Sequence, residues 1–325
     1  MTRVVQVHEF GGPEVLRIDD VDLGDVKPGD VRIRVRAIGL NRVDALFRSG
    51  QFGAPPRPAA IGYEAAGVVE ALGKGVKGFA IGDRVAVIPA PFMGTYGEEI
   101  DYPADLVVKI PQNLSFEAAA ATWMQYLTAY ALIELAHVQA DDVVVITAAS
   151  SSVGLAAIQI ASTVKAIPVA VTRGRSKHDA LMQQGARHVV VTEESGLADG
   201  VSRITSGRGA RIVFDAVAGT TLPDLIAASA QEGVIILYGS LGGEPSVLPA
   251  YMAMLKHLTI HGFTTRYVID DAQRRARAVD FVLTGLASGQ LRPVIDREFA
   301  FDAIADAHRY LESNAQVGKI VVTVP

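Results

Sequence analysis

From Val143 onward, short runs of branched apolar residues alternate with segments of helical character. The predicted strands are 143–147, 169–171, 188–191, 212–216, 234–237 and 259–262, and the predicted helices between them include 153–164 and 176–184. Continuous apolar strands that alternate with helices are typical of a parallel sheet covered on both faces. We therefore predict a doubly wound, six-stranded α/β domain in this part of the chain.

The first third of the chain, to about Asn113, is different. Val31–Val35 and Val85–Ile88 alternate in the manner of short strands, and glycine and proline separate such runs. This pattern favours a compact, largely antiparallel, barrel-like domain. Alanine-rich helical sequence extends from Ser115, a predicted helix cap, to about Ala136.

The last part of the chain contains a predicted helix, 271–288, which Gly289 ends, and a predicted strand, 318–322. Because the parallel sheet already has six strands, we expect this tail to return to the first domain. The predicted domains are 1–122 with 265–325 and, between them, 123–264.

Composition excludes several classes of protein. The chain has 325 residues and no cysteine, which excludes disulfides, thiol nucleophiles, iron–sulfur clusters and cysteine-ligated zinc. A formal net charge of -5 without a basic stripe argues against nucleic acid or an anionic membrane surface as a partner. Apolar runs such as Val143–Ala149 are shorter than the roughly 18 residues of a spanning helix, and the start resembles no signal segment. We therefore expect a soluble cytoplasmic protein.

The strongest local signal is the stretch 143–155, in which a buried strand enters a helix through a turn of small residues. The N-terminus of such a helix offers backbone N–H groups and a positive dipole end to a pyrophosphate. Of the three glycines in the usual dinucleotide fingerprint the chain keeps only Gly154, and Ala149 and Ser151 stand at the other two positions. The predicted pyrophosphate site comprises Ser150, Ser151, Ser152, Val153 and Gly154. The alternative is an α/β turn that binds nothing.

Cations come directly after the next predicted strand. A carboxylate that would accept the ribose 2′-hydroxyl of NAD is missing there, and Thr172, Arg173, Arg175 and Lys177 stand in its place. Cations in the first turn of a helix oppose its dipole, which suggests an anionic partner. We therefore predict NADP(H), with Thr172, Arg173 and Lys177 at the 2′-phosphate. A solvated loop is the alternative.

Six short stretches, spread over nearly the whole chain, together resemble one known family of proteins. They are Ala37–Asp44, Ile61–Val69, Gly82–Val85, Leu127–Tyr130, Val153–Gln159 and Gly318–Val321. In these stretches the sequence resembles the zinc-independent quinone oxidoreductases (zeta-crystallin-like) of the medium-chain dehydrogenase/reductase superfamily. The resemblance implies a GroES-like β-barrel catalytic domain, a Rossmann domain inserted in it, an active site in the cleft between them, and a homodimer.

Zinc-dependent relatives ligate their catalytic metal through two cysteines and a histidine, and the resemblance places Asn41, Tyr63 and Met124 at those positions. Such side chains do not make a zinc site. Asp44 and Glu64 match positions that support the metal in those relatives, and we expect structural roles for them here. His257 and His261 lie in predicted strand sequence, which would separate them by about 13 Å, so we expect no metal there either.

The resemblance also implies positions for site residues. For catalytic roles we predict Asn41, Tyr63 and Tyr130, the two tyrosines as donors to a carbonyl. Further predicted cofactor contacts are Thr128, Tyr238, Gly239, Ser240, Phe263, Thr264, Asn314 and Lys319. We expect Arg274, Arg275 and Arg277 to form a solvated helix face.

Without a metal, the acceptor must itself delocalise the negative charge that arrives with the hydride. A quinone, or an α,β-unsaturated carbonyl attacked at its β-carbon, meets this requirement better than a simple ketone. The sequence thus predicts an NADPH-dependent reductase of quinones or enones. Two alternatives stay open: an enoyl-thioester reductase, and a catalytically inactive, crystallin-like NADPH-binding protein.

Overall fold

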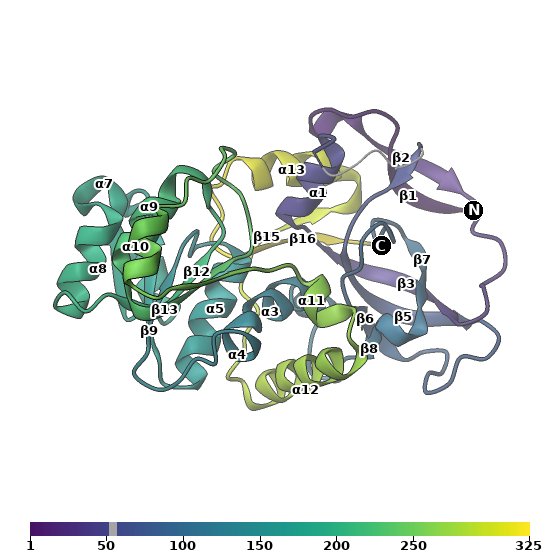
Figure 1. Ribbon diagram of the computed structural model, residues 1–325. Coiled ribbons are helices and arrows are strands. Elements are labelled where there is room, and N and C mark those ends of the chain that lie inside the picture. The colour runs from purple at the N-terminus through teal and green to yellow at the C-terminus, as the bar shows by residue number, and fades with distance from the viewer. Residues whose placement is uncertain (52–56) are drawn as a thin grey trace. The chain divides into compact units, whose positions relative to one another are not determined.

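The computed structural model describes residues 1–51 and 57–325. They form two compact units: a first unit of Met1–Met124 with Pro293–Pro325, and a second unit of Gln125–Arg292 (Figure 1). Within the described residues, no helix combines the length and the apolar content needed to span a bilayer.

The first unit consists mainly of antiparallel strands. They are β1 (Thr2–Val7), β2 (Leu16–Val21), β3 (Asp30–Gly39), β4 (Ala59–Ala60), β5 (Glu64–Leu72), β6 (Arg84–Val87), β7 (Glu99–Pro103), β8 (Val107–Lys109), β15 (Ile295–Ala300) and β16 (Lys319–Thr323). One sheet has the order β2-β1-β4, and the other has the order β15-β16-β3-β5-β6-β8, with β7 paired to β3. Its helices are α1 (Arg42–Arg48), α2 (Phe116–Ala120) and α13 (Ile304–Glu312).

Strand β3 illustrates how the alternating pattern builds this unit. Val31, Ile33 and Val35 are fully buried in its hydrophobic core. On the opposite face Arg32 forms an ion pair with Asp101 of β7 at 2.8 Å. Because successive side chains of a strand point to opposite faces, one face enters the core and the other carries charge. The predicted antiparallel domain is confirmed.

The second unit contains the predicted parallel sheet. Its strands are β9 (Val143–Ile146), β10 (Ile167–Thr172), β11 (His188–Val191), β12 (Ala210–Asp215), β13 (Ser229–Leu237) and β14 (Thr259–Gly262). Their order is β11-β10-β9-β12-β13-β14, and all neighbouring pairs are parallel. The chain order reverses between β9 and β12, which is the arrangement of a doubly wound fold. The predicted α/β class is confirmed.

Helices accompany these strands along the chain. They are α3 (Trp123–Ala129), which crosses the boundary between the units, α4 (Ala131–Glu134), α5 (Ser152–Thr163), α6 (His178–Gln183), α7 (Thr192–Ser195), α8 (Leu197–Thr205), α9 (Leu222–Ala228), α10 (Ala250–Leu255), α11 (Arg266–Ile269) and α12 (Ala272–Ser288). Two predicted helix ends are confirmed. Ser115 Oγ caps α2 by accepting from the backbone N–H of Ala118 at 3.1 Å, and Gly289, with φ of +71°, ends α12.

The structure differs from the sequence prediction at the second domain boundary. Residues 265–292, which we expected in the first domain, belong to the second unit. Helix α12 buries Ala278 and Val282, and Phe281 packs against Tyr130 with ring centroids 5.5 Å apart. Gln159 of α5 also holds the backbone of Arg292 through two hydrogen bonds of 2.9 Å. The chain therefore leaves the second unit only after Arg292.

Arginines of α12 contribute to this attachment. Arg274 and Arg277 form ion pairs with Glu134 of α4, at 3.3 and 2.8 Å. Arg275 donates to the carbonyl of Ile269 at 2.6 Å. The predicted solvated face is therefore correct only in part: Arg277 stays exposed, but the arginines also hold neighbouring groups, because α4 lies within reach, which the sequence does not reveal.

Candidate functional site

The turn between β9 and α5 has the geometry that its sequence predicts. Ser151 is the N-cap of α5, and its Oγ accepts from the N–H of Gly154 at 3.1 Å. A Cβ atom on Gly154 would lie 2.6 Å from the carbonyl oxygen of Ala149. Gly154 is therefore required where the helix passes the strand. Since the first N–H groups of a helix lack intrahelical partners, the turn at Ser152 and Val153 can receive an anion.

The segment after β10 contacts this turn. Lys177 Nζ donates to Ser150 Oγ at 3.1 Å, so one predicted 2′-phosphate residue lies beside a predicted pyrophosphate residue. Thr172 is the last residue of β10, and Arg173 after it is exposed and forms no ion pair among the described residues. Arg175, in contrast, is held by Glu194 through two hydrogen bonds, of 2.7 and 2.6 Å. Arg173 therefore differs from Arg175 in having no ion pair within the described residues.

Other predicted cofactor residues come after neighbouring strands of the same sheet. Tyr238, Gly239 and Ser240 stand after β13, and Phe263 and Thr264 stand after β14. The carboxyl ends of parallel strands share one edge of the sheet, so these residues lie at the same edge as the β9–α5 turn. The Tyr238 ring stacks on Phe214 with centroids 4.1 Å apart.

Two predicted residues follow the unit boundary, Thr128 in α3 and Tyr130 between α3 and α4. Thr128 is buried in α3. Tyr130 is buried against Phe281, and it lines a hollow of about 320 Å³ together with residues of α12.

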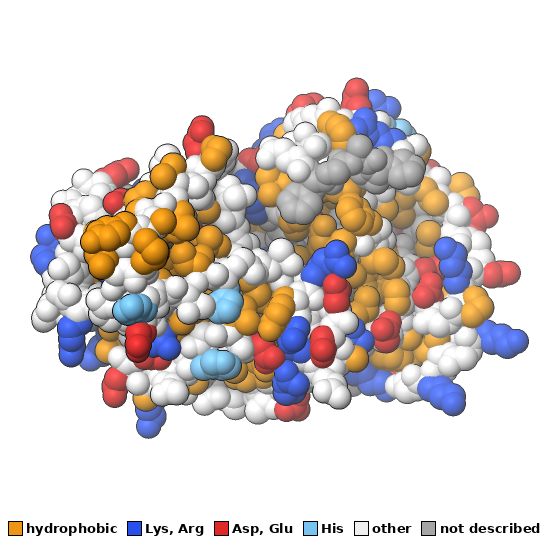
Figure 2. Space-filling view, viewed as in Figure 1, with side chains coloured by type: hydrophobic (Ala, Val, Ile, Leu, Met, Phe, Trp, Pro, Cys, Tyr) orange, Lys and Arg blue, Asp and Glu red, His pale blue; other side chains and the backbone are white. Residues whose placement is uncertain are grey.

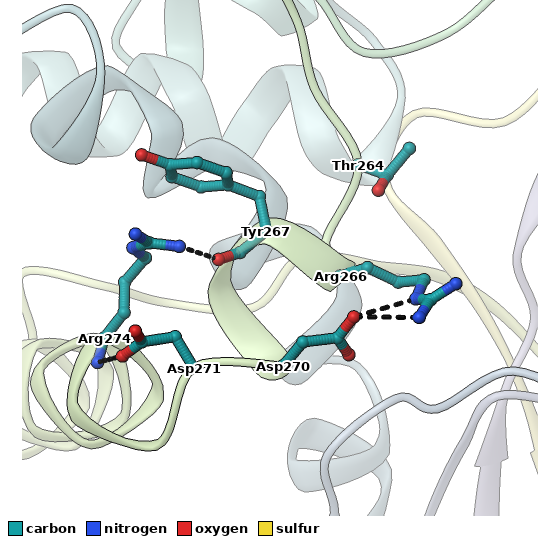
Figure 3. A pocket seen from close by; sticks show the side chains of 6 residues that line it. All are labelled: Thr264, Arg266, Tyr267, Asp270, Asp271 and Arg274. Carbon is teal, nitrogen blue, oxygen red and sulfur yellow. Dashed lines mark hydrogen bonds and ion pairs between the residues drawn. The ribbon is translucent and has the colours of Figure 1, made fainter.

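A second hollow, of about 460 Å³, begins at Thr264 (Figure 3). Its wall contains Tyr267, over whose ring the Arg274 guanidinium lies at 3.8 Å from the centroid. Arg266, the first residue of the short helix α11, pairs at 2.9 Å with Asp270, the residue that follows this helix. The charges around this hollow are therefore largely neutralised within the chain.

Sequence reasoning missed a buried carboxylate at the end of β12. Asp215 accepts from Thr147 Oγ1 at 2.6 Å and from the N–H groups of Val217 and Ala218 at 3.1 and 2.7 Å. Burial raises the pKa of this carboxyl group. These contacts fix the loop after β12 beside the end of β9. The sequence did contain a signal for this carboxylate, namely an aspartate directly at the end of an apolar predicted strand, Phe214–Asp215.

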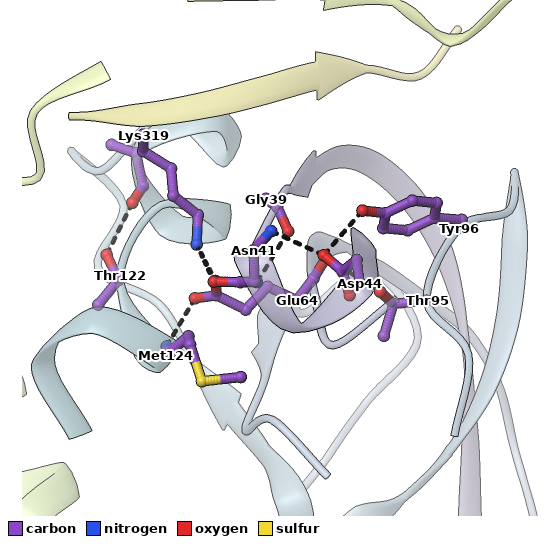
Figure 4. Close-up of polar contacts among 10 residues, drawn as sticks. Gly39, Asn41, Asp44, Glu64, Thr95, Tyr96, Thr122, Met124 and Lys319 are labelled. Atoms are coloured by element: carbon purple, nitrogen blue, oxygen red, sulfur yellow. Dashed lines mark hydrogen bonds and ion pairs between the residues drawn. The ribbon is translucent and has the colours of Figure 1, made fainter. Parts of the chain in front are cut away.

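A buried polar cluster occupies the first unit, where β3, β5 and β16 meet (Figure 4). It consists of Asn41, Asp44, Glu64, Tyr96 and Lys319, and we call it the Asn41 cluster. Lys319 Nζ donates to Asn41 Oδ1 at 2.6 Å and also to Glu64 Oε2. Asn41 Nδ2 in turn donates to Glu64 Oε2 at 3.0 Å and to the carbonyl of Gly39 at 3.2 Å. Both N–H bonds of the Asn41 amide are therefore used within the chain.

Both carboxylates of the cluster accept further hydrogen bonds. Glu64 Oε1 accepts from the N–H of Met124 at 2.7 Å, which holds the first turn of α3. Asp44 Oδ2 accepts from the N–H of Asn41 at 2.7 Å and from the Tyr96 hydroxyl at 2.8 Å. Burial raises the pKa of Asp44 to about 7. The structural roles expected for Asp44 and Glu64 agree with these contacts.

The structure brings Lys319 into the cluster but not Asn314. Asn314 lies beyond the end of α13 and accepts from Arg42 at 2.5 Å in an exposed position. The two residues were predicted together as cofactor contacts, and both assignments stay predictions.

Tyr63 precedes β5 and is nearly buried. Burial, with a smaller effect of the Asp44 charge, raises the pKa of its hydroxyl to about 12. Among the described residues, no hydrogen bond engages this hydroxyl. Of the two predicted catalytic residues in the first unit, Tyr63 therefore keeps a proton to donate, while the Asn41 amide is already engaged.

His308 of α13 lies next to the cluster. Its ring meets Tyr96 edge-on with centroids 5.8 Å apart, and neither ring nitrogen has a hydrogen-bond partner among the residues that the structure describes. Burial, together with the nearby charges of Arg48 and Arg42, lowers the pKa of His308 to about 3. The imidazole is therefore neutral in the folded protein near pH 7.

Two family models match the chain. "Alcohol dehydrogenase GroES-like domain" matches residues 27–112, within the first unit, and "Zinc-binding dehydrogenase" matches residues 152–283, within the second. A quinone oxidoreductase from Pseudomonas aeruginosa is 31% identical over 99% of both chains.

Solved structures agree with these matches. A quinone oxidoreductase from Pseudomonas syringae is 30% identical over 99% of this chain and all of its own, with a TM-score of 0.93. The Escherichia coli quinone oxidoreductase, solved in complex with NADPH, is 26% identical over 99% of both chains, with a TM-score of 0.91.

The name of the second family model implies zinc, so the donor groups of the first unit must be tested for it. Asn41 Oδ1 and both Glu64 oxygens already accept hydrogen bonds, two of them from the Lys319 ammonium. A cation that is already present opposes the approach of a divalent ion. Nor do the described residues contain a group of three or more His, Cys, Asp or Glu side chains suited to a metal. The Asn41 cluster therefore does not fit a zinc ion.

His308 should make stability depend on pH. Its pKa is about 3 in the folded chain and about 6.5 when unfolded. Because the folded value is depressed, the contribution to stability is complete above pH 6.5 and is lost as pH falls toward 3. From pH 6.5 to 5.0 the free energy of unfolding should fall by about 2 kcal/mol more in the unsubstituted chain than in His308→Leu. Denaturant unfolding monitored by the fluorescence of Trp123, buried in the first unit, measures the difference.

The variant Asp44→Asn is the control, because Asp44 and His308 should change the pH dependence of stability in opposite directions. The folded-state pKa of Asp44 is raised to about 7, so its contribution is lost as pH rises toward 7. Identical pH slopes for His308→Leu and the unsubstituted chain would contradict the assignment.

Proposed function

This chain belongs to the quinone oxidoreductase family of the medium-chain dehydrogenases/reductases, and on that premise we propose that it uses NADPH to reduce quinones or the activated double bond of α,β-unsaturated carbonyls without a metal. When bound, NADPH supplies the hydride. The chain's own residues bind the phosphates, orient the two reactants and stabilise the oxyanion that develops on the acceptor.

The observation that carries this proposal is the state of the polar groups in the first unit. The Asn41 amide and the Glu64 carboxylate are engaged with Lys319, which leaves the Tyr63 hydroxyl as the donor. A single hydroxyl is a weak electrophile compared with a zinc ion. It suits acceptors that spread negative charge over an enolate or a hydroquinone.

The residues of the second unit fit NADP(H). Ser151 and the first turn of α5 would receive the pyrophosphate, and Arg173 and Lys177 would receive the 2′-phosphate. We also retain the other predicted roles in this unit. They are cofactor contacts for Thr128 and the residues after β13 and β14, and a catalytic role for Tyr130.

We also propose that two copies of the chain associate. Figure 2 shows hydrophobic side chains gathered over α10. The exposed apolar residues there are Val247, Leu248, Tyr251, Met252, Met254 and Leu255. The neighbouring strand β14 is an edge of the six-stranded sheet. Monomers rarely leave such a patch beside an unpaired strand, which supports a homodimer.

The cytoplasmic location expected from the sequence stays a prediction.

The decisive experiment monitors oxidation of NADPH and NADH by the purified, chelator-treated protein. The acceptors are quinones, 2-alkenals, cyclic enones, an enoyl thioester and simple ketones. We expect activity with NADPH on quinones or enones, insensitive to chelation. Turnover confined to enoyl thioesters would select the enoyl-thioester reductase, and NADPH binding without turnover would select the inactive binding protein. Activity restricted to ketones and abolished by chelation would refute the proposal.

Cofactor preference should depend on Arg173 and Lys177. Each makes a charge-assisted contact in the proposed complex, so Arg173→Ala or Lys177→Ala should raise KM for NADPH about 10- to 100-fold. KM for NADH, which has no 2′-phosphate, should change less than about twofold. Arg175→Ala is the matched control, because Arg175 is engaged by Glu194, and KM should stay unchanged. A larger effect in Arg175→Ala than in Arg173→Ala would contradict the assignment.

Tyr63→Phe should slow the chemical step. Loss of one oxyanion donor lowers kcat about 100-fold, and KM for NADPH should stay within about twofold. Because the pKa of Tyr63 is about 12, kcat of the unsubstituted enzyme should show no loss from its ionisation below about pH 11. Tyr310→Phe is the control, because Tyr310 is half-buried in the same unit and its hydroxyl donates to Asp296. Equal kcat values for Tyr63→Phe and the unsubstituted enzyme would remove Tyr63 from the reaction.

A further inference from the structure

Lys319 carries one of the most deeply buried charges in the described structure. Its side chain is 1% exposed, and that of its partner Glu64 is 0% exposed. Removal of either charge from water is costly, and a buried ion pair persists only where hydrogen bonds satisfy both partners. Lys319 meets this condition by donating to Glu64 and Asn41, and Glu64 meets it by also accepting from Asn41 and Met124.

The two groups that accept hydrogen bonds from the ammonium are an amide oxygen and a carboxylate oxygen. Asn41 Oδ1 and Glu64 Oε2 contact it directly. Asp44 lies in the same cluster, and its Oδ1 is a buried oxygen without a hydrogen-bond partner among the described residues. Amide and carboxylate oxygens are the ligands that hard divalent cations prefer. The oxygens around Lys319 Nζ therefore resemble the ligands of a metal cation, and the ammonium occupies the position that such a cation would take.

We propose that the Lys319 ammonium is a built-in cation that takes the place of a metal ion in the Asn41 cluster and thereby excludes divalent cations from it. This inference rests on the proposed metal-free reduction, and it explains why a chain that matches a zinc-binding family model needs no metal at this position. Lys319 is a positioning residue. It holds the Asn41 amide and, through Glu64, the backbone N–H of Met124 at the start of α3.

The proposal predicts a metal site that forms only when the ammonium is removed. Lys319→Ala leaves space and an uncompensated Glu64 charge beside Asn41 Oδ1. We expect this variant to bind about one Mn²⁺ per chain. The unsubstituted, chelator-treated protein should bind none at this site. Loss of the six-line electron paramagnetic resonance signal of free Mn²⁺ measures binding, and a rise in Tm of Lys319→Ala on addition of Mn²⁺ provides the second readout.

Two controls locate the binding site. Lys319→Ala/Glu64→Gln should bind no Mn²⁺, because the carboxylate is gone. Lys256→Ala should also bind none, because Lys256 Nζ donates only to carbonyl oxygens, at the end of α9. Mn²⁺ binding by the unsubstituted protein that Glu64→Gln abolishes would overturn the proposal. A folded Lys319→Ala that binds no Mn²⁺ would also overturn it.

A second test does not require Lys319→Ala to fold. The charge-neutral double variant Lys319→Met/Glu64→Gln should have a Tm several degrees above that of either single variant, since neither charge is then left alone. A Tm no higher than that of the less stable single variant would overturn the proposal. None of these measurements uses turnover, so an inactive enzyme would count against the proposed function and not against the role of Lys319.

Discussion

The buried ion pair between Lys319 and Glu64 is the interaction on which the first unit depends. It joins residues that are 255 positions apart, and through Asn41 it also reaches the end of β3. Loss of one partner from such a pair typically costs about 3–5 kcal/mol, because the other charge is left buried and alone. The same contacts occupy the Asn41 amide, and this is why the chemistry that we propose relies on Tyr63. One ion pair thus links the assembly of the unit to the kind of acceptor that we propose for the enzyme.

The second unit depends on the parallel direction of its strands. Six parallel strands bring every turn at a strand's carboxyl end to one edge, so Ser151, Lys177 and Tyr238 come together although they are far apart in the chain. The charges at this edge are not equivalent. Glu194 neutralises Arg175, whereas Lys177 contacts the hydroxyl of Ser150 at the pyrophosphate turn. The local contacts thus hold Arg175 at Glu194 and place Lys177 beside the pyrophosphate turn.

Features set by neighbouring residues could be predicted from the sequence. The strand–turn–helix unit around Gly154, the serine cap of α2 and the glycine end of α12 depend on local backbone geometry, and all three are confirmed. Features set by partners distant in the chain could not be predicted. The pairing of Arg274 and Arg277 with Glu134 placed α12 in the second unit, and it depends on how α4 and α12 pack. The place of Lys319 beside Asn41 likewise requires the pairing of β16 with β3. The Thr147–Asp215 contact requires two neighbouring strands.

The division of the first unit between two separated chain segments has a consequence for biosynthesis. Residues 125–292 are contiguous, so the second unit can complete its sheet while the ribosome is still translating residues 293–325. The first unit must wait for β16, which pairs with β3 and supplies Lys319. Until that strand emerges, Glu64 has no ammonium to neutralise it, and the end of β3 at Ala37–Gly39 lacks its neighbouring strand. The first unit therefore stays incomplete, with a buried charge unpaired, during the whole interval between translation of β3 and of β16.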